Sequence, residues 1–352
     1  MNPVTSRPTI ARRGLSASAA ARIHPLGLLP LALALLFGAC TEATAPPPPE
    51  LPAEIVVGTG PTGIASVGDW IAAGEVNFDF GTGAFGPGRV SWIDPERGVV
   101  VRTTAVGVNP QRLVRAGAAG EFLAAVCTGD YGPRAGRVEV LDVATGALLR
   151  SIEVGGQPGA AVSGGGDTLW LGSYGESGVA AVDVATGALL RSWQSDAGFE
   201  AAALVRGGRG LVAADFDDDL VLELDGAGAV VGAVAVGDGP VALAADPADP
   251  DRIYVVNSLD ETAGVVDLRA QTFTRFPDTV GHAPNDIRWQ GGELWIVASL
   301  SNRVNRLDPA GGTILSGYDL GVNHNPMQIA FYGDHAFVTN LLANSVSVLA
   351  LP

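Results

Sequence analysis

Residues 284–320 read PNDIRWQGGELWIVASLSNRVNRLDPAGGTILSGYDL and contain one complete unit of the architecture. It contains four short runs of strand-forming residues (NDIRW, ELWIVAS, RVNRLD and TILSGYDL), separated by turns that are rich in Gly, Asn or Asp. The core of the second run, LWIVA, is apolar at every position, which is typical of a strand buried on both faces. The stretch therefore predicts a four-stranded antiparallel sheet that is covered on both sides.

This unit recurs with a period of about 42 residues. One series consists of strands that end in Asp, at spacings of 48, 41, 42, 42 and 41, with Ala350 at the seventh position: Asp94, Asp142, Asp183, Asp225, Asp267 and Asp308. A second series consists of prolines that follow a Gly-containing turn, here called corner prolines, with Phe199 at the missing position: Pro61, Pro110, Pro158, Pro240, Pro284 and Pro326. Each series has seven positions, so the sequence predicts an all-β, seven-bladed β-propeller.

The last repeat holds only three strands, whereas residues 54–58 (EIVVG) form a strand-like run before the first corner proline. We expect this N-terminal strand to complete the seventh blade beside residues 344–351. Such closure removes two exposed sheet edges, which an open ring would leave free to aggregate.

The runs IYVVN (residues 253–257) and FVTN followed by NSVSVL (residues 337–349) resemble the YVTN-family β-propeller repeat. The resemblance covers residues 51–352 and rests on structural motifs. It implies an extracytoplasmic or surface protein without shared catalytic residues.

The N-terminus predicts export to the cell envelope. Residues 25–39 (PLGLLPLALALLFGA) form an apolar run behind a segment with four Arg and no acidic residue, as in a secretory signal peptide. The run ends in Phe37-Gly38-Ala39-Cys40, which resembles the lipobox of bacterial lipoproteins and implies that Cys40 is lipidated. Cleavage that leaves Cys40 unmodified is the alternative.

We therefore assign residues 1–39 to a signal peptide, 40–52 to a Pro-rich tether and 53–352 to the propeller. The expected location is periplasmic or at the outer membrane or cell surface, with membrane attachment through the lipid alone. Cys127 would then be the one free thiol, and we expect it to be buried in a strand.

Composition excludes several functions. All 21 basic residues are Arg, so neither a Schiff-base lysine nor a phosphate-loop lysine exists. After Cys40, 17 Arg face 37 acidic residues, a balance that repels phosphate backbones and argues against nucleic acid as a partner. The sequence contains no His-Glu-x-x-His, Cys-x-x-Cys or Gly-x-Ser-x-Gly motif, although a catalytic triad assembled from separate blades remains open.

The face around the channel mouth is the candidate binding surface, because the corners and the loops between second and third strands meet there. It receives the longest insertions, residues 75–88 and 128–136. The candidate ligand-binding residues on this face are Asp215, Asp238, His282, Asn285 and His324. Asn257 and Asn340 also fall there, and we interpret them as structural residues of the repeat.

Three of these candidates could bind a metal. Asp238, His282 and His324 each precede a corner proline by two residues, and two imidazoles with a carboxylate suit zinc or another first-row metal. The alternative is that each residue caps its own corner. We expect no cofactor apart from this divalent ion.

The sequence favours a monomeric, lipid-anchored binding or scaffold protein whose channel mouth faces a protein, a glycan or a small ligand. The alternative is a metal-dependent hydrolase of the lactonase or gluconolactonase type, because Pro284-Asn285-Asp286 resembles the Pro-Asn-Gly stretch that supplies a metal ligand in those propellers. The equivalent first corner, Gly-Thr-Gly-Pro at residues 58–61, lacks their acidic ligand, so enzymatic activity stays open.

Overall fold

The computed structural model describes residues 50–194 and 197–352, and this part of the chain consists of β-strands, turns and loops without a helix. No helix in these two ranges is therefore long and apolar enough to cross a membrane. The predicted signal peptide, Cys40 and the tether up to residue 49 lie outside the described residues.

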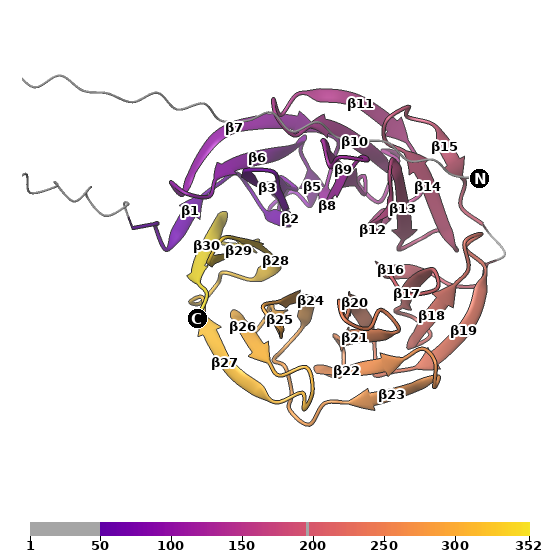
Figure 1. The fold of residues 1–352 in the computed structure, drawn as a ribbon. Helices are drawn as coiled ribbons and strands as arrows, with labels where there is room; N and C mark the ends of the chain where they lie inside the picture. Colours follow the sequence, from indigo (N-terminus) through magenta and orange to yellow (C-terminus); the bar gives the residue numbers. More distant parts are fainter. Residues whose placement is uncertain (1–49, 195–196) are drawn as a thin grey trace, which may run out of the picture. The chain divides into compact units, whose positions relative to one another are not determined.

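Seven four-stranded antiparallel sheets follow one another around a ring, which confirms the predicted propeller and its blade count (Figure 1). Blade 1 contains β2 (Pro61–Val67), β3 (Trp70–Glu75), β6 (Gly88–Asp94) and β7 (Val99–Val106). Blade 2 contains β8 (Pro110–Ala116), β9 (Phe122–Cys127), β10 (Arg137–Asp142) and β11 (Leu148–Glu153). Blade 3 contains β12 (Pro158–Gly165), β13 (Thr168–Ser173), β14 (Val179–Asp183) and β15 (Leu189–Arg191).

The remaining blades repeat this order, with the first strand of each blade lining the centre of the ring (Figure 1). Blade 4 contains β16 (Ala201–Arg206), β17 (Leu211–Asp215), β18 (Leu220–Leu224) and β19 (Val230–Ala235). Blade 5 contains β20 (Pro240–Ala245), β21 (Arg252–Asn257), β22 (Thr262–Asp267) and β23 (Thr272–Arg275). Blade 6 contains β24 (Pro284–Gln290), β25 (Glu293–Ala298), β26 (Arg303–Leu307) and β27 (Ile314–Asp319).

Blade 7 joins the two ends of the propeller. It contains β28 (Pro326–Tyr332), β29 (His335–Asn340), β30 (Ser345–Ala350) and, as its outermost strand, β1 (Glu54–Val56). The central β1 residue, Ile55, lies opposite Val346 in the antiparallel register. The predicted closure by the N-terminal strand is confirmed, and Figure 1 shows β1 beside β30.

The core lies between neighbouring blades, because the middle strands bury both of their faces. Val138 of blade 2 and Leu171 of blade 3, for example, belong to one buried cluster, and Trp92 and Trp295 are among the largest fully buried side chains. Burying one such Val or Leu side chain contributes about 1.5–3 kcal/mol. Cys127 is buried at the end of β9, as expected, and desolvation raises the pKa of its thiol.

The repeated Asp has a local structural role. In blade 2, Asp142 Oδ1 accepts hydrogen bonds from the backbone N–H and the hydroxyl of Thr145, at 2.7 and 2.6 Å, and these bonds lower the pKa of the Asp142 carboxyl. Asp183 accepts the equivalent bond from the Thr186 N–H in blade 3. The Asp side chain thus fixes the turn between third and fourth strands, which explains why this residue type marks the repeat.

Candidate binding site at the channel mouth

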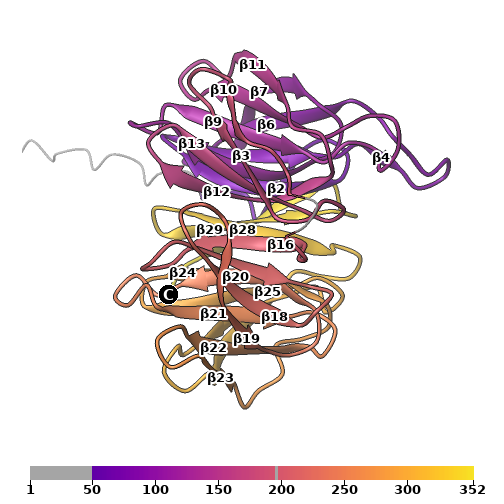
Figure 2. The same cartoon turned by 90° about the vertical axis from the view of Figure 1, so that its right-hand side faces the viewer.

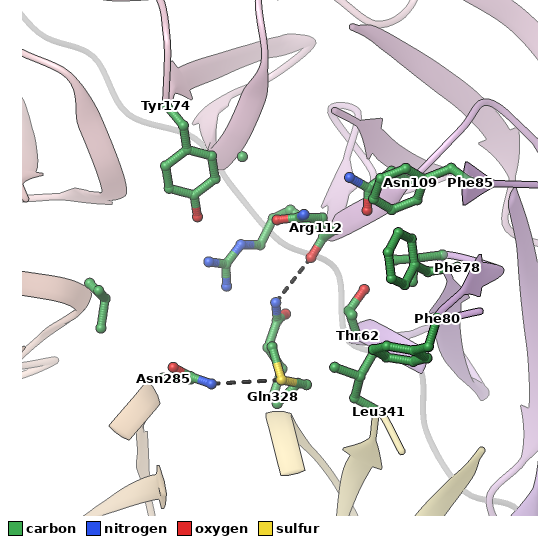
Figure 3. A pocket seen from close by; sticks show the side chains of 15 residues that line it. Thr62, Phe78, Phe80, Phe85, Asn109, Arg112, Tyr174, Asn285, Gln328 and Leu341 are labelled. Atoms are coloured by element: carbon green, nitrogen blue, oxygen red, sulfur yellow. Dashed lines mark hydrogen bonds between the residues drawn. The ribbon is translucent and has the colours of Figure 1, made fainter. Parts of the chain in front are cut away.

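A cavity of about 320 Å³, here called the mouth cavity, opens where the first strands of the blades begin (Figure 3). Six of its lining residues share one position, immediately after the corner proline or its equivalent in six of the seven blades: Thr62, Gln111, Gly159, Val241, Asn285 and Met327. The repeat therefore directs the same position of each blade toward the ring axis. As predicted, the corners meet at the channel mouth.

The corner holds this position through a left-handed residue directly before the proline. Gly239, Ala283 and Asn325 have φ values of 65°, 48° and 51°. Their carbonyls accept hydrogen bonds of 2.7–3.0 Å from the loop between second and third strands, for example from Ser258 N to Gly239 O. Gly and Asn tolerate this conformation best, which accounts for their recurrence at the corners.

An aromatic wall closes one side of the mouth cavity. The insertion in blade 1 forms a small hairpin of β4 (Phe78–Asp79) and β5 (Ala84–Phe85), which extends from the ring in Figure 2. The Phe78 ring lies 4.7 Å from that of Phe85 and 4.9 Å from that of Phe80, between centroids. Asp79 Oδ1 accepts the Gly81 N–H at 2.8 Å and so fixes the hairpin turn. All three Phe residues line the cavity.

The insertion in blade 2 braces this hairpin. Arg134 Nη2 donates to the Phe85 carbonyl at 2.9 Å, and its Nε pairs with Asp130 at 2.8 Å. The Tyr131 ring lies 6.0 Å from that of Phe85, and its hydroxyl accepts a hydrogen bond from Gln111 Nε2 at 2.9 Å. The two insertions thus form one connected structure over the cavity, an arrangement that the sequence alone did not predict.

Arg112 forms the polar side of the cavity. Its side chain lines both the mouth cavity and a second cavity of about 550 Å³, here called the channel cavity, which follows the first strands through the ring. Among the described residues, the Arg112 guanidinium makes no hydrogen bond and no ion pair within 4 Å. Figure 3 shows it extending into the cavity between Tyr174 and Gln328.

Arg112 is half-buried, and one ion pair lies nearby. Desolvation lowers the pKa of its guanidinium, and the charge of Asp286 opposes that shift. Asp286 is itself engaged, because its Oδ2 lies 3.2 Å from Arg288 Nε and accepts the Ile329 N–H at 3.1 Å. Desolvation also raises the pKa of Tyr174, so its hydroxyl stays neutral. Arg112 thus remains a charged donor without a bound acceptor.

Two amide side chains at the cavity also lack partners. Asn109 is 1% exposed, and neither its Nδ2 nor its Oδ1 has a hydrogen-bond partner among the described residues. The Oε1 of Gln328 is likewise unpaired, although its Nε2 donates to the Gln111 carbonyl at 3.0 Å. A buried polar atom without a partner costs about 1–3 kcal/mol. A polar ligand in the cavity would recover part of that free energy.

Of the predicted ligand-binding residues, Asn285 lines the mouth cavity, where its Nδ2 contacts Ser299 Oγ and lies 3.6 Å from Met327 sulfur. Asp215 lies outside both cavities. It is buried at the end of β17, and desolvation followed by the charge of Asp218 raises the pKa of its carboxyl. Asn257 and Asn340 are buried and donate to hydroxyls of the next strand, which agrees with their structural interpretation.

The predicted metal site of Asp238, His282 and His324 does not form. Within residues 50–194 and 197–352, no three His, Cys, Asp or Glu side chains lie close enough together to hold one ion. His282 Nδ1 instead lies 2.5 Å from Glu261 Oε1, and His324 Nε2 lies 3.5 Å from Glu54 Oε1.

The backbone explains why these three positions repeat. The carbonyls of Asp238, His282 and His324 accept the N–H groups of the neighbouring loops at 3.1–3.2 Å, and the donors are Leu259, Leu300 and Leu342. The backbone of each residue therefore closes its own corner, while the side chains of His282 and His324 contact Glu261 and Glu54.

No protein-family model matches the sequence, and no curated protein matches it either. Solved structures similar to the propeller include the β-propeller domain of Cps50 (Swd1) from Myceliophteria thermophila, with a TM-score of 0.67 at 14% identity, covering 84% of this chain and 99% of that one. Hydrazine synthase from Kuenenia stuttgartiensis has a TM-score of 0.67 at 18% identity, with 83% and 95% covered. Virginiamycin B lyase from Staphylococcus aureus has a TM-score of 0.64 at 15% identity, with 84% and 96% covered. At such identities the likeness establishes the β-propeller fold alone.

Proposed function

We propose that this protein is a binding protein of the cell envelope that takes up a small ligand in the mouth cavity. The observation that carries the proposal is the pairing of a three-phenylalanine wall with the unpaired guanidinium of Arg112 in one cavity. Binding sites for small molecules are concave, largely apolar and equipped with a few convergent polar groups, and their volumes run from about 300 to 1,000 Å³. A volume of about 320 Å³ favours a small ligand over a protein or an extended glycan.

The rigidity of the corners supports the same function. The six cavity-lining residues that share the position after a corner proline each belong to a strand of the closed ring, and hydrogen bonds hold their corners. A site that is already ordered before binding loses little conformational entropy when the ligand arrives. The fold therefore suits a binding protein that presents a preformed pocket.

Attachment to a membrane through lipidated Cys40 is part of the proposal and rests on residues 25–49. The four prolines at positions 46–49 favour an extended spacer between the lipid and the propeller. As for the lactonase alternative, no arrangement of the described residues specifically favours it: Asp286 is engaged by Arg288 and Ile329, and Asn285 by Ser299.

The test is a fragment screen by thermal shift on the full-length protein, compared with Val241→Trp, which fills the cavity from blade 5. The matched control is Leu300→Trp, because Leu300 is 67% exposed on the same face and does not line the cavity. A ligand at 100 times its Kd stabilises the folded state by about 2.7 kcal/mol. Hits should stabilise the wild type and Leu300→Trp but not Val241→Trp, and equal stabilisation of all three would refute the proposal.

A further inference from the structure

We infer that the ligand of the mouth cavity is an organic monoanion, with one carboxylate bound by Arg112 and a compact aromatic or apolar body packed against the hairpin phenylalanines. This inference rests on the proposed binding function and names its ligand class. It joins three features of the cavity: an unpaired guanidinium, a local charge balance of one positive unit, and an exposed aromatic wall.

The first step concerns the charge on Arg112. A guanidinium remains protonated in proteins and presents five N–H donors in a planar fork, which matches the two oxygens of a carboxylate. Arg112 is half-buried inside the ring, where its attraction to an anion is stronger than in open water. Arg112 is the one cavity-lining side chain with a full charge among the described residues. It therefore provides the anchoring point for an anion.

The second step concerns the number of negative charges. The charged groups facing the Arg112 guanidinium are Asp286 and Arg288, which pair with each other at 3.2 Å, while Tyr174 stays neutral. The three charged side chains together leave one positive unit. A monoanion neutralises it, whereas a phosphate dianion would leave a net negative charge beside Asp286 in a medium of low dielectric. The cavity is thus balanced for a carboxylate.

The third step concerns hydrogen bonding beside the carboxylate. The unpaired amide of Asn109 lies on the cavity wall between Arg112 and Phe85 in Figure 3. The unpaired Oε1 of Gln328 lies on the opposite side. A ligand with a hydroxyl or amide group next to its carboxylate would satisfy these atoms, and this adds polar specificity to the anion site.

The fourth step concerns the ligand's body. Phe80 is 66% exposed, and its ring joins those of Phe78 and Phe85 in one patch that lies beside Thr62 and Leu341 (Figure 3). None of the three rings belongs to a buried core cluster among the described residues. An exposed aromatic cluster held by two braced insertions is typical of a binding surface.

The experiment measures by calorimetry the binding of three carboxylates (benzoate, 3-phenylpropanoate and cyclohexylacetate) and of their primary amides to the full-length protein. At least one acid should bind the wild type about 10- to 100-fold more tightly than its amide, as expected for hydrogen bonds to a charged group. Arg112→Gln should abolish this preference. Arg115→Gln is the matched control, because Arg115 lies on the same strand and already donates to the carbonyls of Ala119 and Gly120.

Two further measurements keep the result decisive. Phe78→Ala should weaken the acid and its amide by the same factor, since it removes apolar contact alone. Arg112→Lys should retain a preference for the acid if Arg112→Gln misfolds.

One outcome would overturn the inference but support the binding function: the wild type binds acid and amide with equal affinity, and Val241→Trp binds neither. No binding by any of the six compounds would overturn the inference, and the fragment screen would then decide on the binding function separately.

Discussion

Closure of the ring by β1 can be tested with two neighbouring residues that lie on opposite faces of that strand. Ile55 is 4% exposed and belongs to a cluster that contains residues of blades 1 and 7, whereas Val56 is 79% exposed. Ile55→Ala removes three carbon atoms, worth about 0.8 kcal/mol each, and leaves a cavity. We expect a loss of about 3 kcal/mol in the free energy of unfolding. For a domain of this size that lowers Tm by about 6 °C.

Val56→Ala serves as the control and should change the free energy of unfolding by about 0.5 kcal/mol or less. Urea unfolding followed by the fluorescence of buried tryptophans such as Trp92 and Trp295 measures both variants. Equal effects of the two substitutions would contradict the pairing of β1 with β30. Deletion of residues 51–58 extends the test, because it exposes the edge of β30 and should produce aggregates in size-exclusion chromatography.

Three further predictions address other parts of the chain. Replacement of Cys40 by Ser should abolish incorporation of labelled palmitate, and equal labelling of both forms would argue against lipidation. Ala283→Gly should stabilise the propeller by roughly 0.5–1 kcal/mol, because Ala283 has a φ of 48°, and a lower Tm would refute this reasoning. Asp142 and Asp183 have lowered folded-state pKa values, so their stabilisation is present above the unfolded pKa of about 3.9 and is lost as pH falls further. Between pH 5 and 3, the Tm of the double variant Asp142→Asn/Asp183→Asn should therefore fall less than the Tm of the wild type.

The fold could be predicted because its markers are local. The Asp at the end of each third strand fixes a turn through its own side chain, and the corner proline follows a left-handed residue. Each of these requirements recurs in six of the seven blades, so they leave a visible period in the sequence. Closure by β1 could be predicted because the last repeat contains only three strands and the N-terminal strand has no blade of its own.

The site was harder to predict because it depends on which residue of the corner faces the axis. Three of our five candidates lie two residues before a corner proline, as His282 does, whereas the cavity is lined by the residue after the proline. Asn285 was the one candidate at that position, and equivalent residues such as Gln111 and Met327 were missed. Between these positions the backbone passes through a left-handed residue, and the side chain before it contacts a neighbouring loop, as His282 contacts Glu261 of blade 5. A difference of three residues therefore separates a corner cap from a cavity wall.

Two signals in the sequence could have identified the missed residues. Two positions after the corner proline, or after Phe199 in blade 4, four blades carry Gly or Ala. Blades 2, 6 and 7 instead carry Arg112, Asp286 and Gln328. Charged residues at an inward position that is small in most blades indicate a function inside the channel. The insertion at residues 75–88 also holds three of the chain's 11 Phe residues in a Gly-rich segment, which favours an exposed aromatic surface.

The aromatic insertion and the charged inward residues break the symmetry of the ring. Their position explains how a ring of similar blades can bind a small ligand in one orientation. Corners alone would surround the axis with equivalent positions, and such a ring could not orient a small ligand. The aromatic hairpin occurs only in blade 1 among the described residues, and its brace and Arg112 both belong to blade 2. The apolar wall and the charge thus come from neighbouring blades, so a ligand with one charged end and one apolar end has a single favourable orientation.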